Sequence, residues 1–522
     1  MGTDGLSRRG FIKRAGLGIA VAALPGCAWS ARSGGKAAAG SRPNIILIMA
    51  DDMGYSDLGC FGGEIDTPNL DALAREGMRY RQFYNCAKCG PTRATLLTGQ
   101  YDQAVGKSRM EHGVTFGEVL RKAGYRTIIS GKWHQSPLPT TRGFDRYFGL
   151  ADGCCNFWNP GTEARPGEPA PGRKRKSARR WAIEGEAIAG YVPEKKDFYT
   201  TDEFANYAIE RLEEYKGEDK PWLLYLPFTA PHYPLHAWPE DIAKYRGRYR
   251  MGWDALRERR YKRQVEMGVI DAKYAVSPRD PAVPAWETLS EKEKDEYDLL
   301  MSVYAAMVDR MDQAIGRVFA KVRQLGDWDN TLVMFLSDNG GCAENVNTTP
   351  ETPPGPVESY RTLGREWANA CNTPYRKYKS SDYEGGNCTP FIARWPGVIE
   401  PGTMTDQVGH IIDIMPTMMD VAGASYPETF DGRKIKPLAG KSLVPIFEGR
   451  QREGHEWLFW QFGKAKAARQ GKWKLVRFGD ADWQLYDLEA DRTELHDVAK
   501  EHPDRVERMV AAWERWWEQC KG

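Results

Sequence analysis

The sequence predicts an α/β protein with a large, doubly wound, mostly parallel sheet and a small C-terminal antiparallel sheet closed by a helix. Strongly apolar runs occur at residues 45–50, 125–130, 222–226 and 331–336. Such runs are typical of strands that are buried on both faces of a parallel sheet. Helical patterns at residues 70–76, 115–122 and 299–325 separate these runs. Strands that alternate with helices predict the doubly wound arrangement.

The chain changes character after Pro445. Short strand-like runs at residues 456–460, 473–477 and 483–486 are separated by turns, and residues 505–519 alternate apolar and charged side chains at helical spacing. We therefore expect one large domain over residues 43–445 and a small α+β domain over residues 446–522.

Residues 1–42 resemble an export signal followed by a linker. Arg8 and Arg9 precede an apolar stretch at residues 15–24 that is too short to span a bilayer. The pattern resembles a bacterial twin-arginine signal and predicts a periplasmic protein. The sequence LPGC at residues 24–27 resembles a lipoprotein cleavage site, so a lipid on Cys27 is an alternative that would add a membrane anchor.

Composition and charge exclude some partners. The chain has 522 residues, of which 41% are hydrophobic and 28% are charged, with a net charge of +2. This is the composition of a water-soluble globular protein. A nearly neutral chain has no global attraction for nucleic acid or for an anionic bilayer, so we expect no nucleic-acid partner. Any preference for an anionic ligand has to be local.

Two segments look inserted. Residues 161–196 contain the basic run at 173–176 together with Arg179 and Arg180, and residues 245–263 are rich in Arg and Tyr. A charge run usually forms a solvated face, which is our first interpretation here. Contact with substrate is the alternative.

Four oxygen-bearing side chains follow two of the predicted strands. Asp51 and Asp52 end the first run, and Asp338 and Asn339 follow the last one. The carboxyl edge of an open parallel sheet is where such folds bind ligands. Oxygen ligands select calcium or magnesium over zinc, so the four residues predict a hard-cation site.

Four potentially cationic side chains are expected at the same edge. Lys132 and His134 follow the second run, His232 follows the third, and Lys379 lies further along the chain. Several cations around one divalent metal make little sense as core packing. They suit the binding of a tetrahedral oxyanion such as sulfate or phosphate.

Cys89 lies at the start of a predicted helix. Pro91 suits the first turn of that helix and Gly99 can close it. A helix N-terminus lowers the pKa of a thiol and attracts anions, and Arg93 lies one turn further on. A thiolate is nevertheless a poor partner for a hard cation. The spacing Cys86-x-x-Cys89 suggests a redox or zinc pair, but the ten cysteines include no second pair of this kind.

The sequence around Cys89 resembles the signature of the type I sulfatases, in the alkaline phosphatase superfamily. Their cysteine is oxidised after translation to Cα-formylglycine. The motifs that carry the resemblance are CGPTR at 89–93 with LTG at 97–99, ADDMG at 50–54, GKWH at 131–134, APHYP at 230–234, SDNGG at 337–341, and YRKYK at 375–379 before EGG at 384–386. They span nearly the whole of residues 43–445, which the resemblance identifies as the catalytic domain with an alkaline-phosphatase-like fold.

The resemblance implies a role for each residue of the site. Asp51, Asp52, Asp338 and Asn339 would hold Ca²⁺, and the hydrated aldehyde made from Cys89 would complete its shell and attack the sulfur with help from Arg93. His134 would help to expel sulfate. Lys132, His232 and Lys379 would bind the sulfate oxygens, and His232 or Lys379 would protonate the leaving group. A formylglycine-generating enzyme is then an expected partner.

The chain departs from the family pattern at Thr92, where Ser is common, and Gly90 is one of several small residues accepted after the cysteine. Both bear on the efficiency of maturation. His410 also lies in a family-like stretch, and we interpret it as structural or rim-forming rather than catalytic.

We expect a sulfatase that acts on an aryl or carbohydrate sulfate ester, with a sulfated polysaccharide as one candidate. The basic segment at 161–196 and residues 345–367 should shape the pocket mouth and decide between these substrates. One alternative is a phosphonate monoester or phosphodiester hydrolase of the same superfamily. Another is a non-catalytic surface protein that binds sulfated glycan through residues 173–180.

Overall fold

The structure, a computed structural model, describes residues 42–521. The expected twin-arginine signal, the linker and Cys27 lie outside the described residues. None of the described helices combines the length and the apolar character needed to cross a bilayer.

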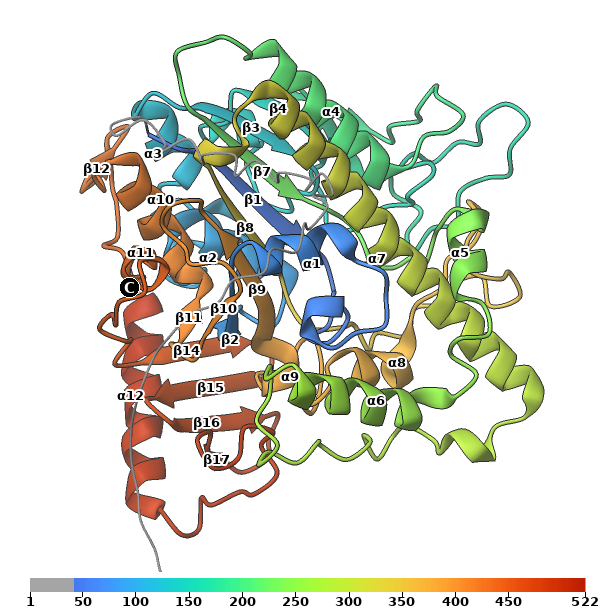
Figure 1. Cartoon of the computed structure of the whole chain (residues 1–522), viewed down its shortest axis with the longest axis vertical. Helices are drawn as coiled ribbons and strands as arrows, with labels where there is room; N and C mark the ends of the chain where they lie inside the picture. Colours follow the sequence, from blue (N-terminus) through green and yellow to red (C-terminus); the bar gives the residue numbers. More distant parts are fainter. Residues whose placement is uncertain (1–41, 522) are drawn as a thin grey trace, which may run out of the picture. The chain divides into compact units, whose positions relative to one another are not determined.

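The four apolar runs form neighbouring strands of one large sheet. β1 (Asn44–Ala50) pairs in parallel with β7 (Trp222–Pro227) on one side and with β8 (Thr331–Ser337) on the other. β3 (Arg126–Ser130) adds to β7 in parallel, and β4 (Arg146–Leu150) adds to β3. The doubly wound, mostly parallel sheet predicted from the sequence is confirmed (Figure 1).

Alternate side chains of β1 enter two separate cores. Ile46, Ile48 and Ala50 belong to one core cluster, and Ile45, Leu47 and Met49 belong to the other. The first cluster contains residues of α1 (Pro68–Arg75), α4 (Thr200–Glu214) and α7 (Glu291–Leu325). The second contains residues of α2 (Cys89–Thr98), α3 (Phe116–Lys122) and α10 (Ile414–Ala422). Helices therefore cover both faces of the sheet, which explains why side chains on both faces of its central strands are apolar.

Antiparallel strands complete the large sheet. β9 (Cys388–Arg394) lies between β8 and β2 (Met78–Tyr84) and runs antiparallel to both. At the other side β5 (Arg180–Ile183) and β6 (Glu186–Ala189) form a hairpin that extends β4. The short strands β10 (Thr403–Thr405) and β11 (Gly409–His410) pair with β2, and β12 (Thr429–Phe430) pairs with β13 (Arg433–Lys434).

The C-terminal residues form a separate antiparallel sheet with a helix against it. The strands are β14 (Leu458–Phe462), β15 (Ala465–Gln470), β16 (Trp473–Phe478) and β17 (Gln484–Asp487), each paired with the next. α12 (Pro503–Lys521) packs on β15 and β16, and Trp513 Nε1 donates to the Trp460 carbonyl at 3.0 Å (Figure 1). The predicted small antiparallel sheet and closing helix are therefore present, with β15 as an additional strand.

Two helices differ from the sequence expectation. α7 begins at Glu291 rather than near 299, because Ser290 and Glu293 form a capping box ahead of the apolar pattern. Much of the Arg- and Tyr-rich segment at 245–263 forms α6 (Gly252–Glu266). Arg260 of α6 is buried and pairs with Asp57 at 2.7 Å and with Glu64 at 2.8 Å, so this segment is packed into the protein.

The remaining α-helices are short. They are α5 (Pro239–Tyr245), α8 (Gly364–Cys371), α9 (Glu384–Asn387) and α11 (Val444–Phe447).

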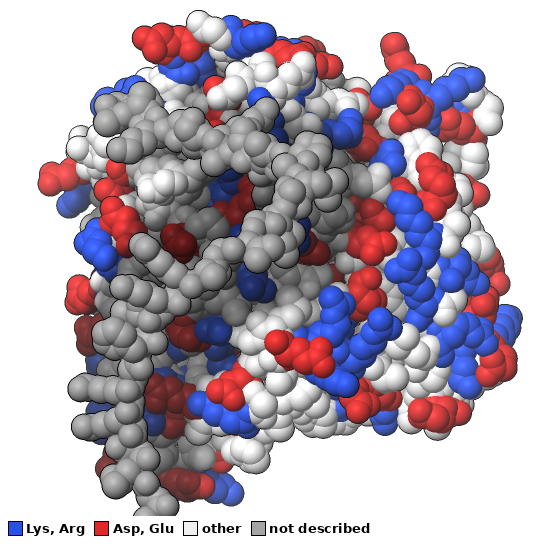
Figure 2. Space-filling view, viewed as in Figure 1, with Lys and Arg blue, Asp and Glu red and all other residues white. Residues whose placement is uncertain are grey.

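Acidic and basic side chains are interspersed over the face that carries α6 and α7 (Figure 2). This face therefore offers no broad patch of one sign to a nucleic acid.

Candidate active site

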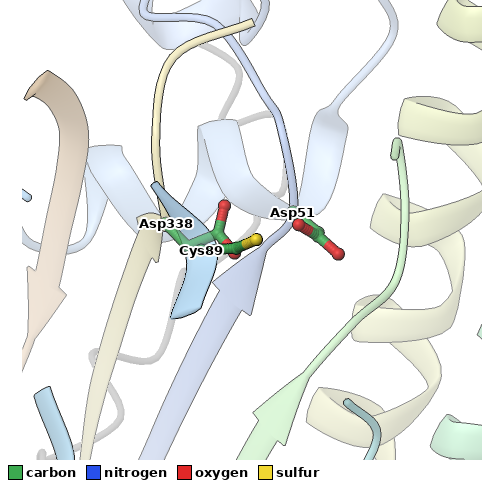
Figure 3. Close-up of side chains that lie close together, drawn as sticks. All are labelled: Asp51, Cys89 and Asp338. Atoms are coloured by element: carbon green, nitrogen blue, oxygen red, sulfur yellow. The ribbon is translucent and has the colours of Figure 1, made fainter. Parts of the chain in front are cut away.

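Two adjacent strand ends bring four oxygen-bearing side chains together. β1 and β8 run parallel, with Ala50 opposite Ser337, so Asp51 and Asp52 emerge beside Asp338 and Asn339. Figure 3 shows Asp51 and Asp338 at these strand ends. Asn339 Nδ2 donates to Asp52 Oδ1 at 2.7 Å, and the Asp52 backbone N–H donates to Asp338 Oδ1 at 3.2 Å. All four side chains are buried. The four oxygen donors predicted from the sequence thus meet at one place.

Cys89 faces this group from the N-terminus of α2. It is the first residue of the helix, and its Sγ lies within 4.8 Å of carboxylate oxygens of Asp51 and Asp338 (Figure 3). Thr92 fixes the helix there, since its hydroxyl donates to the Asp338 carbonyl at 2.7 Å and accepts from the Cys86 N–H at 3.0 Å. The Cys86 thiol instead donates to Thr95 Oγ1 at 3.5 Å. The two cysteines therefore have separate surroundings and do not act as a pair.

Three buried cations neutralise the acidic group. Arg93 donates through Nη2 to Asp338 Oδ2 at 2.8 Å and through Nη1 to the Lys132 carbonyl at 2.8 Å. Lys132 Nζ lies 2.5 Å from Asp51 Oδ2, and Lys379 Nζ lies 2.5 Å from Asp52 Oδ1. Their three side chains are at most 2% exposed, so these contacts are shielded from solvent.

Lys379 reaches the site through a loop that packs on the end of β8. The Lys379 N–H donates to the Gly341 carbonyl at 3.1 Å, and the Gly340 N–H donates to the Gly386 carbonyl at 3.0 Å. A Cβ atom on Gly340 would lie only 2.0 Å from the Gly385 carbonyl oxygen. Glycine is therefore required where the SDNGG and EGG segments meet.

Burial favours the neutral form of both histidines of the site. Burial, reinforced by the charge of Lys132, lowers the pKa of His134 well below its ordinary value. Burial also lowers the pKa of His232 well below that value, against the opposing effect of Asp52. Burial opposes the charge of Lys379, but the Asp52 carboxylate prevails and raises its pKa well above the usual range. Lysine rather than histidine thus supplies positive charge here.

Several buried oxygens of the site have no hydrogen-bond donor. Among the described residues, Asp51 Oδ1, Asp52 Oδ2 and Asn339 Oδ1 are buried without a hydrogen-bond partner. An unsatisfied buried acceptor costs about 1–3 kcal/mol, and more when it is charged. Carboxylate and amide oxygens are the ligands that hard divalent cations prefer. The residues therefore fit a bound divalent cation at this position.

A cleft opens from Cys89 to the surface. It encloses about 1320 Å³, including solvent at its open side, and His134, His232 and Lys379 line it with Cys89. Lys174, Arg175, Arg179 and Arg180 from the basic segment also line it. Lys174, Arg175 and Arg180 are exposed and Arg179 is half-buried, so this segment is solvated, as expected, and also borders the cleft. A smaller cavity adjoins the cleft and shares Cys154, Arg175 and Arg179 with it. Of residues 345–367, only Tyr360 is among the residues that line the cleft or this cavity.

Sequence reasoning missed part of the cleft wall. Lys88, Tyr233 and Glu344 line it, and Glu344 lies 2.7 Å from Lys88 Nζ and accepts from the Tyr233 hydroxyl at 2.6 Å. Lys88 precedes the CGPTR motif and Tyr233 lies within the APHYP motif, which was the available signal for them. Glu344 lies outside these motifs, and no sequence pattern marked it. His410 does not line this cleft; it is fully buried, and its Nδ1 accepts from the Ile412 N–H at 3.2 Å.

Comparison with known proteins identifies the family. The sulfatase family model matches residues 43–424, and the model of the C-terminal part of N-sulphoglucosamine sulphohydrolase matches residues 378–515. An uncharacterized sulfatase of Schizosaccharomyces pombe is 33% identical, covering 92% of this chain and 94% of its own. An arylsulfatase of Klebsiella aerogenes is 32% identical, covering 80% and 95%.

Solved structures share the fold. The structure of Ps i-CgsB in complex with k-i-k-neocarrahexaose superposes with a TM-score of 0.66 at 25% identity, covering 92% of this chain and 93% of that one. The phosphonate monoester hydrolase of Agrobacterium radiobacter superposes with a TM-score of 0.55 at 20% identity, covering 92% and 95%. The family match and the curated relatives show what these structures alone do not: the chain belongs to the sulfatase family and is a sulfate ester hydrolase.

Proposed function

We propose that this sulfatase uses a formylglycine residue made from Cys89 and a calcium ion held by Asp51, Asp52, Asp338 and Asn339. The observation that carries the proposal is the set of three buried oxygens of Asp51, Asp52 and Asn339 that have no hydrogen-bond partner among the described residues, at strand ends where the Cys89 thiol lies within 4.8 Å of carboxylate oxygens of Asp51 and Asp338. They fit a hard cation, and a thiol is a poor companion for such a cation. An oxygen nucleophile in place of the sulfur removes this mismatch. When present, the two groups supply that nucleophile and polarise the sulfate oxygens.

The side chains of the cleft divide the remaining work. Lys132 and Lys379 carry positive charge and are placed to bind the sulfate oxygens, while Arg93 stabilises the charge that develops at the helix N-terminus. His134 is neutral, and its Nδ1 is one of the buried unpartnered atoms of the described residues. It can therefore accept a proton from the nucleophile.

Protonation of the leaving group falls to His232 or Lys379, and the contacts favour Lys379. His232 Nδ1 lies 2.5 Å from the Tyr233 carbonyl, which accepts the single proton of a neutral ring. Its Nε2, 3.4 Å from Asp52 Oδ2, then has no proton to give. The ammonium of Lys379 has one, so His232 is left to orient the substrate.

The substrate that we propose is an aryl or carbohydrate sulfate ester. The K. aerogenes relative is called an arylsulfatase, whereas the Ps i-CgsB structure is a complex with k-i-k-neocarrahexaose. A phosphonate monoester or phosphodiester hydrolase remains the alternative activity, because the similarity to the A. radiobacter enzyme extends to the fold. Export by the N-terminal signal would place the enzyme in the periplasm. The formylglycine-generating enzyme that it needs would have to act on Cys89 before export.

The proposal is tested by activity and by substitution of Cys89. The enzyme is produced together with a formylglycine-generating enzyme and supplied with para-nitrophenyl sulfate and a para-nitrophenyl phosphodiester, which have the same leaving group. We expect faster hydrolysis of the sulfate, and Cys89→Ala should abolish it. Preference for the phosphodiester would establish the alternative, and full activity of Cys89→Ala would exclude the proposed nucleophile.

A further inference from the structure

The cleft of the active site has a basic wall that the mechanism does not use. Lys174, Arg175, Arg179 and Arg180 line it from the segment at 161–196, and Lys88 lines it from the residue before α2. The carboxylates that line the same cleft are those of Asp152 and Glu344. The wall thus carries an excess of positive charge next to the cysteine.

The two carboxylates are already engaged by part of this wall. Asp152 Oδ1 accepts from Arg180 Nε at 3.0 Å. Glu344 accepts from Lys88 Nζ at 2.7 Å and lies 3.9 Å from Lys174 Nζ. Burial favours the protonated form of Glu344, but Lys379 and Lys88 prevail and hold its pKa at about 2. These cations are therefore compensated by carboxylates that stay ionised.

Arg175 and Arg179 are not compensated in this way. Within residues 42–521, neither guanidinium has a carboxylate oxygen within 4.0 Å, whereas Arg180, next in sequence to Arg179, is paired. Arg179 Nη2 donates to Cys154 Sγ at 3.3 Å, and a thiol sulfur is a weak acceptor. A guanidinium with free N–H groups binds sulfate or carboxylate oxygens in pairs.

The size of the cleft leaves room for such an anion. The cleft itself has room for about 580 Å³, which lies within the range of about 300–1,000 Å³ for pockets that take drug-sized ligands. Lys132 and Lys379 are placed to bind the sulfate ester, so Arg175 and Arg179 remain available to another anionic group.

We propose that the cleft takes a saccharide with a second anionic group beside the sulfate ester that is cleaved, and that Arg175 and Arg179 bind this second group. The inference rests on the proposed function, because the first group is the ester at Cys89. A second sulfate and a uronate carboxylate present the same chemistry to two arginines. The opposing outcome is that these basic residues form a solvated face that does not distinguish ligands with one anionic group from ligands with two.

The test is the binding selectivity of the full-length protein, measured by isothermal titration calorimetry with calcium present. The probes are a galactose monosulfate, a galactose disulfate and a monosulfated disaccharide that contains glucuronate. We expect at least one doubly anionic probe to bind about tenfold more tightly than the monosulfate, which is the effect of one charge-assisted contact. In the Arg175→Ala/Arg179→Ala variant this advantage should fall below about twofold.

Lys176→Ala is the matched control, because Lys176 belongs to the same basic run and is exposed but does not line the cleft. It should keep the selectivity of the wild type. The advantage of the disulfate, or of the glucuronate probe, identifies which anion is bound. Equal affinity for all three probes, or the same selectivity in the double variant as in the wild type, overturns the inference. Turnover of para-nitrophenyl sulfate is measured in parallel. If there is no turnover but the doubly anionic probes still bind more tightly, the proposed function is refuted and this inference is not.

Discussion

The hydroxyl of Thr92 holds the N-terminus of α2 against the end of β8, and its removal should be costly. Thr92→Val keeps the shape of the side chain but leaves the Cys86 N–H and the Asp338 carbonyl without their 3.0 Å and 2.7 Å hydrogen bonds. Thr92 is fully buried, so water cannot replace the hydroxyl without rearrangement. Each buried group left unpaired costs about 1–3 kcal/mol, which gives a loss of about 2–6 kcal/mol in the free energy of unfolding.

Thr92→Ser provides the matched comparison. Serine retains both hydrogen bonds and removes one methyl group, which costs about 1 kcal/mol. Chemical denaturation of both variants measures the difference, and hydrolysis of para-nitrophenyl sulfate shows whether Cys89 is still in position. We expect the serine variant to stay active and the valine variant to lose both stability and activity. Equal free energies of unfolding for the two variants would refute the role of the hydroxyl.

Three further predictions concern the metal site, a buried ion pair and pH. Calcium should raise the melting temperature, with about 2.7 kcal/mol of stabilisation at a hundred times its Kd, and Asp52→Asn should weaken this effect. Lys474→Met should destabilise the fold by about 3–5 kcal/mol, because Lys474 Nζ lies 2.7 Å from Glu384 and 3.0 Å from Glu494, both fully buried, and Glu384 would keep only weaker partners in the Tyr84 hydroxyl and Arg492 Nε, 3.6 Å away; Lys472→Met, which removes a partly exposed pair with Asp487, should cost much less. Burial raises the pKa of Asp102 from 3.8 to about 7; the folded state then keeps a proton that the unfolded chain has lost, so stability should fall as pH rises from about 4 to 7, and Asp102→Asn should flatten this part of the profile.

Each of these has a clear contrary result. If the melting temperature does not respond to calcium, the buried oxygens of Asp51, Asp52 and Asn339 do not bind this cation. Similar losses in Lys474→Met and Lys472→Met would show that the buried pair adds nothing beyond a surface pair. An unchanged slope in Asp102→Asn, measured by denaturation at several pH values, would assign the pH dependence to another group.

Burial on both faces made the central strands predictable. β1, β7 and β8 are apolar except at the ends of β1 and β8, because helices cover both sides of the sheet. β15 has the sequence AKAARQ, without a β-branched or aromatic residue, and forms a strand because β14 and β16 pair with it on both sides. The antiparallel direction of β9 depends on how the chain returns to the sheet, which no local pattern encodes.

The position of the site was likewise predictable where it depends on strand ends. Asp51 and Asp338 follow adjacent parallel strands, and this alone brings them together at the edge. The cleft wall depends on loops instead. Whether an exposed residue such as Arg175 borders the cleft is decided by the path of residues 161–179, which precede β5, form no helix or strand and are rich in Pro and Gly.

The most direct test of the account is the relation between activity and the chemical state of Cys89. Preparations with different fractions of aldehyde are made by varying the supply of the formylglycine-generating enzyme, and mass spectrometry of the peptide that contains Cys89 measures each fraction. The account predicts that kcat for para-nitrophenyl sulfate rises in proportion to the aldehyde fraction and extrapolates to zero for the thiol. Full activity in a preparation that contains only the thiol would contradict it.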